Sequence, residues 1–175
     1  MRKHIISFWL FFVIAIGTSA QSDQSLYIGP GIGFDHGGFG AKLEFQPEKH
    51  VGVFGGLGYN LVGAGTNGGI IFNFLPGKRV TPVLTAMYGY NAVIQVTYLD
   101  GKDYGVYSGL TVGAGVDIKL GRSKKSKINV NLLIPFRNAA FFKDYNNLRQ
   151  NGEIRQEMVP VAFSIGWNYN LLYRR

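Results

Sequence analysis

Two histidines follow residue 20, and they are the first candidates for chemistry because histidine exchanges protons near neutral pH and binds metals. His36 precedes two glycines, and His50 ends the turn-forming sequence 47–50. Both lie between alternating segments, at what would be opposite ends of the fold, so they cannot share a metal ion. No His-x-Ser motif is present. We therefore interpret both as turn residues in solvent, and predict no metal site and no catalytic residue.

Glycine supplies 25 of the 175 residues, but its runs do not form a nucleotide-binding motif. Gly29–Gly33 and Gly113–Gly115 lack the G-x-G-x-x-G spacing and lie inside alternating segments, and no Gly-Lys pair has P-loop spacing. Cysteine is absent, which excludes disulfides, thiolate chemistry and a lipoprotein anchor. We expect no cofactor.

The formal net charge is +8, but the basic residues are not arranged for nucleic acid. They are scattered, mostly between the alternating segments, and form no basic helix or stripe. We therefore predict no nucleic-acid partner.

Alternation of large apolar with small or polar residues dominates the chain after residue 20, which predicts β-strands. Turn sequences such as His36-Gly37-Gly38 and Pro76-Gly77-Lys78 separate the segments, so neighbouring strands should pair as antiparallel hairpins. We predict eight strands, at 26–35, 39–46, 51–61, 69–74, 84–96, 109–120, 128–136 and 159–173.

The two faces of these strands predict which solvent each one meets. One face is large and apolar without any charged residue, and the other is rich in glycine, asparagine and threonine. An eight-stranded barrel has little interior room, so the bulky face should meet lipid and the small face the lumen. We predict an all-β, eight-stranded antiparallel up-and-down transmembrane barrel. A soluble periplasmic barrel that binds a lipophilic ligand is an alternative, with the faces reversed.

Few charges fall on the predicted lumen face. We expect opposite charges among them to pair, since an unpaired buried charge is costly. A proton or ion path is the alternative. The residues are Asp35, Lys42, Glu44, Asp117 and Lys119.

The N-terminus has the pattern of a secretory signal peptide. Arg2 and Lys3 precede the apolar run Ile5–Ile16, and small residues lead to Ala20. The run is shorter than the ~20 residues of a membrane-spanning helix. We predict a signal peptide at 1–20 and a barrel domain at 21–175.

Connection lengths predict an orientation. An even strand count puts both chain termini on the periplasmic side, and the two longest connections, 97–107 and 137–158, then lie outside. Aromatic and basic residues in the second suit an extracellular ligand or lipopolysaccharide phosphates, and a mobile solvated loop is the alternative. The candidate interaction residues are Phe141, Phe142, Lys143, Tyr145, Arg149 and Arg155.

Basic residues gather in the predicted periplasmic turns. We interpret them as a rim that meets anionic phospholipid headgroups. They are Lys49, Lys78, Arg79, Arg122, Lys124, Lys125 and Lys127, with Arg174 and Arg175 beside them.

On these features, 21–175 resembles the small bacterial outer-membrane β-barrels of the OmpX and OmpA transmembrane-domain type. The most specific part is 163–173, which looks like the C-terminal signal that the barrel-assembly machinery reads. Arg174 and Arg175 follow it, whereas that signal usually ends on an aromatic residue. Its alternating residues are Phe163, Ile165, Trp167, Tyr169, Leu171 and Tyr173.

The resemblance implies a non-enzymatic protein of the outer membrane of a diderm bacterium, with a structural or surface-interaction role. Its implied partners are outer-membrane lipid and lipopolysaccharide, the barrel-assembly machinery and periplasmic chaperones, and an extracellular ligand at the long connections. We expect a monomer. Some barrels of this size are lipid A deacylases or acyltransferases, so an enzyme that modifies lipid A or phospholipid is the first alternative, ahead of the soluble barrel.

Overall fold

The computed structural model describes residues 24–60, 63–98, 101–150 and 160–172, and within them the side chains of 93–104 and 150 are not described. The predicted signal peptide lies outside these residues. Within them, no helix is long and apolar enough to cross a membrane.

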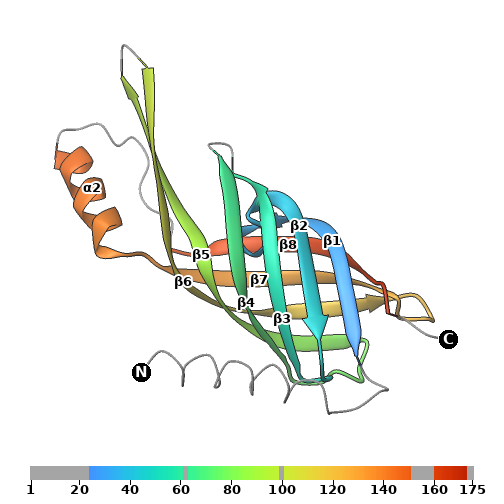
Figure 1. Cartoon of the computed structure of the whole chain (residues 1–175). Helices are drawn as coiled ribbons and strands as arrows, with labels where there is room; N and C mark the ends of the chain where they lie inside the picture. The colour runs from blue at the N-terminus through green and yellow to red at the C-terminus, as the bar shows by residue number, and fades with distance from the viewer. Residues whose placement is uncertain (1–23, 61–62, 99–100, 151–159, 173–175) are drawn as a thin grey trace, which may run out of the picture.

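Eight antiparallel strands form a closed barrel in which each strand pairs with its neighbours along the chain (Figure 1). The barrel closes where β1 pairs with β8, with Gly31 opposite Gly166. The predicted fold class is therefore confirmed. The strands are β1 (Ser25–Gly33), β2 (Gly38–Gln46), β3 (Val51–Tyr59), β4 (Ala64–Asn73), β5 (Val80–Tyr98), β6 (Gly101–Leu120), β7 (Ser126–Phe136) and β8 (Ala162–Asn170).

The wall follows the alternation of the sequence. In β8, Ser164 and Asn168 are buried inside the barrel, whereas Ile165 and Trp167 between them are exposed on the outside. Short turns at 47–50, 74–79 and 121–125 join strands at one end, which we call the turn end. The last of these turns uses left-handed backbone at Gly121 (φ 67°) and Lys124 (φ 52°).

The connection between β1 and β2 turns into the barrel rather than out to solvent. It forms the short 3-10 helix η2 (Phe34–His36), closed by a Gly37 N–H that donates to the Phe34 carbonyl oxygen at 2.9 Å. The interpretation of His36 as a turn residue in solvent is wrong, and Phe34, which the alternation of 26–35 would place on the outward apolar face, lies inside as well. The Phe34 ring meets the Tyr90 ring edge-on, with centroids 5.4 Å apart, and His36 has no exposed surface.

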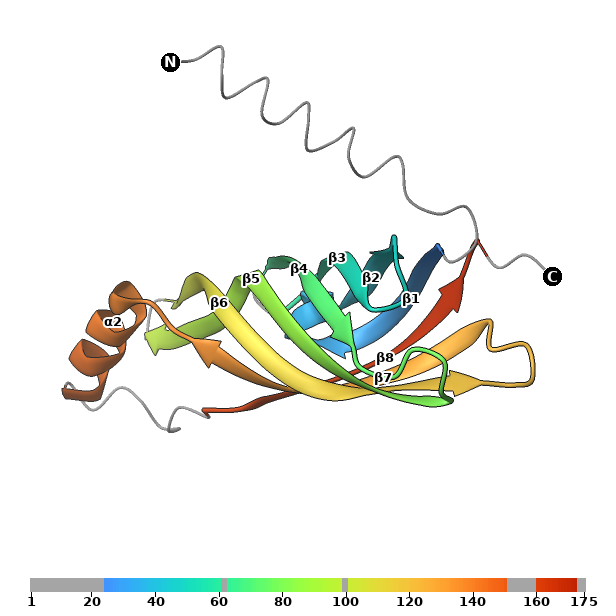
Figure 2. The same cartoon turned by 90° about the horizontal axis from the view of Figure 1, so that it is seen from below.

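The opposite end of the barrel carries a protruding arm (Figures 1 and 2). We define the arm as the β5–β6 hairpin beyond Tyr90 and Ser108 together with α2 (Ala139–Gln150). The predicted loop at 97–107 is instead largely strand, because the β-branched and aromatic residues of 92–98 extend β5. The predicted loop at 137–158 contains a helix, and 151–159 are outside the described residues.

A bulge separates the arm from the barrel wall. The register of β5 against β6 shifts between Tyr90 and Ala92, so an extra residue enters β5. The alternation of the predicted strand 84–96 would place Ala92 outward with Tyr88, but it reverses at the bulge and Ala92 is buried.

The interior has an apolar part and a polar part. The apolar part is a cluster that Phe34 and Ala162 extend, while the polar part holds most of the buried charges. The members of the apolar cluster are Phe54, Ile71, Val83, Met87 and Leu133.

Candidate functional site: the lumen and the arm

Asp35 lies at the centre of the polar part of the lumen. Lys42 Nζ donates to Asp35 Oδ2 at 2.7 Å, and His36 Nδ1 lies 2.9 Å from Asp35 Oδ1. The Ser164 hydroxyl donates to the same Oδ1 atom. Since η2 carries the carboxylate, these contacts tie the inward turn to β2 and β8.

Lys127 lies at the centre of a second buried cluster of charged side chains. Its Nζ donates to Glu44 Oε1 at 2.7 Å and to Asp117 Oδ2 at 2.6 Å, and lies 4.3 Å from the centre of the Tyr27 ring. The side chain is 1% exposed, so its predicted place on the basic rim is wrong. The reason is phase: Lys127 is two residues before Asn129 on the inward face of β7, one position before the predicted strand began.

The structure brings together four of the five residues predicted to carry lumen charges. Asp35, Lys42, Glu44 and Asp117 are buried, and Lys127 joins them. Lys119 lies apart near the turn end, where its ammonium donates to the Pro76 carbonyl oxygen.

The glycines of the lumen face make room for η2. A Cβ at Gly56 would overlap the Asp35 carbonyl oxygen, and a Cβ at Gly31 or Gly166 would overlap the His36 imidazole. The inward turn could not occupy this space if the surrounding wall carried larger residues. Part of the high glycine content of the chain is therefore explained by the room that η2 needs inside the barrel.

The Ser164, Asp35 and His36 side chains resemble a catalytic triad in composition but not in arrangement. The hydroxyl and the imidazole both contact the carboxylate, whereas a triad needs its serine to contact histidine. Asp35 and His36 are also inaccessible to any substrate outside the wall. In the part of the chain that the structure describes, no group of three His, Asp or Glu residues could hold a metal ion.

The arm is held together by aromatic packing. The Asn138 side chain caps α2 by accepting the Phe141 N–H at 2.9 Å. The Phe141 ring packs against Tyr107 and Tyr145, with centroids 5.3 and 5.8 Å away. Tyr107 also donates its hydroxyl to Asp144 Oδ2 at 2.6 Å. These contacts dock the helix on β6.

The arm residues predicted for recognition therefore have different positions. Phe141 is 4% exposed and serves as an anchor inside the arm, and Tyr145 is partly covered. Phe142, Lys143 and Arg149 are exposed on α2, and Arg155 lies outside the described residues.

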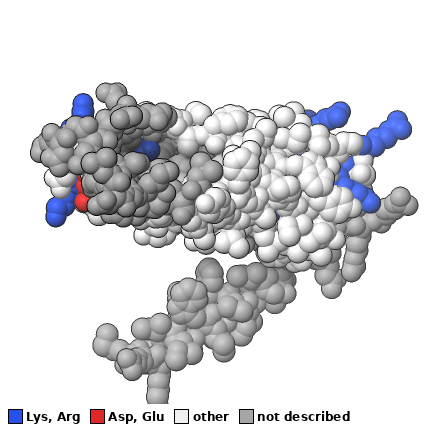
Figure 3. Space-filling model, turned by 90° about the horizontal axis from the view of Figure 1, so that it is seen from above, with Lys and Arg blue, Asp and Glu red and all other residues white. Residues whose placement is uncertain are grey.

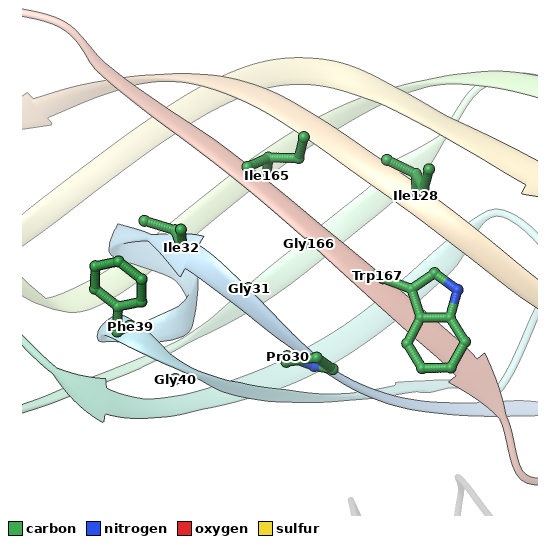
Figure 4. A pocket seen from close by; sticks show the side chains of 9 residues that line it. All are labelled: Pro30, Gly31, Ile32, Phe39, Gly40, Ile128, Ile165, Gly166 and Trp167. Atoms are coloured by element: carbon green, nitrogen blue, oxygen red, sulfur yellow. The ribbon is translucent and has the colours of Figure 1, made fainter.

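An apolar groove of about 510 Å³ runs over the seam between β1 and β8 on the outer wall (Figure 4). Among the residues that line it are Pro30, Ile32, Phe39, Ile165 and Trp167. No charged side chain lines it, so the groove suits an acyl chain and offers no group for catalysis. The predicted assembly-signal residues Phe163, Ile165, Trp167, Tyr169 and Leu171 are exposed on this outer side, and Tyr173 is outside the described residues.

No protein-family model and no curated protein matches the chain. Among solved structures, it matches the crystal structure of the N-terminal β-barrel domain of OprF from Pseudomonas aeruginosa, with a TM-score of 0.50. The match covers 87% of this chain and 100% of that one, at 13% sequence identity. The resemblance to the small outer-membrane barrels is thereby confirmed at the level of the fold.

Proposed function

We propose that the chain is an integral outer-membrane barrel without a catalytic site, and that its arm contacts molecules outside the cell. The observation that carries the proposal is the inverted distribution of polarity. Leu57 and Tyr88 are 62% and 66% exposed on the outer wall, whereas Lys42 and Glu44 are 1% and 0% exposed inside. Large apolar groups cover an outer face only when its solvent is apolar.

The arm supports a surface-interaction role. It protrudes from the end opposite the turns, and α2 presents Phe142, Lys143 and Arg149 on its exposed side. Exposed aromatic and basic residues on one helix suit recognition of an anionic or amphipathic ligand, including lipopolysaccharide. A rigid docked helix loses less conformational entropy on binding than a mobile loop would.

The burial of His36 argues against the alternative of a lipid-modifying enzyme. A catalytic histidine has to reach the substrate, and this imidazole is enclosed by Gly31, Gly166 and η2 itself. We expect lipid A mass spectra from cells with and without the gene to be the same. A mass change that His36→Ala abolishes would contradict this proposal.

Membrane fractionation tests the location. The protein should appear in the outer-membrane fraction, require detergent for extraction and migrate differently on a gel before and after boiling. Recovery from the soluble periplasmic fraction without detergent would contradict the proposal and favour a soluble barrel that binds a lipophilic ligand.

A further inference from the structure

Two neighbouring turns at the turn end concentrate positive charge. The turn between β4 and β5 carries Lys78 and Arg79, and the turn between β6 and β7 carries Arg122 and Lys124, all of them exposed. We call these four residues the turn patch.

Hydrogen bonds fix the two turns side by side. Lys124 Nζ donates to the Gly77 carbonyl oxygen at 3.3 Å, and the Lys119 N–H donates to the Arg79 carbonyl oxygen at 2.8 Å. The Lys119 ammonium also donates a hydrogen bond to the Pro76 carbonyl oxygen. The cations of the turn patch are therefore presented together by the fold rather than by two independent turns.

The charge of the turn patch is not neutralised within the described part of the chain. None of its four side chains forms an ion pair with a carboxylate there. Asp117, the acidic residue of β6 nearest this end, is instead buried beside Lys127. Glu48 is the sole carboxylate in the three described turns of this end. The patch therefore carries a net positive charge that a ligand could meet.

Apolar surface lies directly beside this charge. Phe74 and Leu75, which precede Lys78 in the chain, are about half exposed, and the Phe74 ring packs edge-on against Phe72 of the outer wall. In the view of Figure 3 the Lys and Arg residues lie at the two ends of the molecule, with an uncharged belt between them. An acyl chain against that belt would bring its phosphate to the turn patch.

We propose that the turn patch binds the phosphate of anionic phospholipids in the leaflet at the turn end. The inference rests on the proposed membrane-spanning function, because only an embedded barrel holds this patch at headgroup level. Each Lys or Arg near an anionic membrane surface adds a favourable electrostatic contribution. The arm end differs, because its exposed cations Lys143 and Arg149 lie on a helix that also carries Asp144.

Native mass spectrometry of the detergent-solubilised full-length barrel tests the proposal, with phosphatidylglycerol and phosphatidylcholine as probes. The unmodified protein should bind phosphatidylglycerol more tightly. The double substitution Lys78→Gln with Arg122→Gln should raise the Kd for phosphatidylglycerol roughly tenfold or more. The charge-conserving pair Lys78→Arg with Arg122→Lys changes the same two positions without removing their charge, and should leave that Kd within about twofold.

Equal affinity for the two lipids, or equal losses in the two double variants, would overturn the proposal. Full displacement by inorganic phosphate would show a site for free phosphate rather than lipid. Salt gives a readout that needs no variant: added NaCl should weaken phosphatidylglycerol binding and leave phosphatidylcholine binding unchanged. A barrel that folds in detergent but fails these tests contradicts this inference alone, whereas a chain that is soluble without detergent contradicts the proposed function.

Discussion

The inward and outward faces of the barrel wall come from the same eight strands but meet opposite surroundings. Outside, large apolar side chains such as Leu57, Phe163 and Trp167 stand exposed. Inside, small residues surround η2, and Lys42 and Lys127 are buried against carboxylates. The wall therefore buries its charged residues in the lumen and exposes apolar residues on its outer face, the reverse of a soluble protein.

The largest effect should come from removing a buried cation from the lumen. Lys127→Met leaves Glu44 and Asp117 without their shared partner, so we expect the free energy of unfolding to fall by about 3–5 kcal/mol. Urea titration of the barrel folded in lipid vesicles measures this loss. The exposed Lys124→Met should change the same quantity by less than about 0.5 kcal/mol.

A triple variant sharpens that comparison. Adding Glu44→Gln and Asp117→Asn to Lys127→Met should recover part of the lost stability, because the uncompensated charges are removed. Similar small losses from Lys127→Met and Lys124→Met would contradict the burial of Lys127 between carboxylates.

A charge on the outer wall should cost somewhat less. Ile165→Arg places a guanidinium against lipid, and we expect a loss of about 2–4 kcal/mol if the position lies near the midplane. Ile165→Leu keeps the face apolar and should cost less than about 1.5 kcal/mol. If arginine is tolerated as well as leucine in vesicle-folded protein, the outer wall does not face lipid.

Alanine substitutions at two adjacent glycines, one on each face of the wall, test the effect of adding a single methyl group to each face. Gly56 faces η2, where a Cβ would overlap the Asp35 carbonyl oxygen, whereas a Cβ at Gly55 would have no neighbour within 4 Å. Gly56→Ala should therefore lower the free energy of unfolding by about 1–3 kcal/mol. Gly55→Ala should change it by less than about 0.5 kcal/mol, and equal effects would contradict the inward position of η2.

The smallest effect on the barrel should come from the arm. Phe141→Ala removes the buried ring between α2 and Tyr107, so we expect α2 to lose amide protection in hydrogen exchange. The free energy of global unfolding should change by less than about 0.5 kcal/mol, because the arm lies outside the barrel. The control Phe142→Ala should leave α2 protected, since that ring is exposed; loss of protection in both variants would contradict the anchoring role of Phe141.

Much of the wall could be predicted because alternate residues of a strand face the lumen and the outside of the barrel, so the polarity of the sequence alternates with the same period. Strand β8 and the barrel portion of β6 have the faces expected from sequence. The position of Lys127 was predicted wrongly because the sequence around a basic residue at a strand end looks the same whether its side chain faces the rim or the lumen. Its phase with Asn129 was the available signal, and extending the strand back along the chain would have found it.

The position of η2 had no comparable signal. Phe34, Asp35 and His36 continue the alternation of β1 into the turn, so nothing local separates an inward turn from an outward one. What decides it is space supplied by residues distant in sequence, such as Gly56 and Gly166. The bulge at Tyr90 and the helix α2 likewise depend on contacts across the arm.

Lipid contact at Trp167 distinguishes an outer wall that faces lipid from one that faces water. Trp9 falls in the predicted signal peptide, so the chain 21–175 has Trp167 as its one tryptophan, and that side chain is 45% exposed on the outer wall. In vesicles with brominated acyl chains, we expect strong quenching of the Trp167 fluorescence by the bromine atoms and little quenching by iodide in the water. Fluorescence that iodide quenches and brominated lipid leaves unchanged would contradict a lipid-facing outer wall.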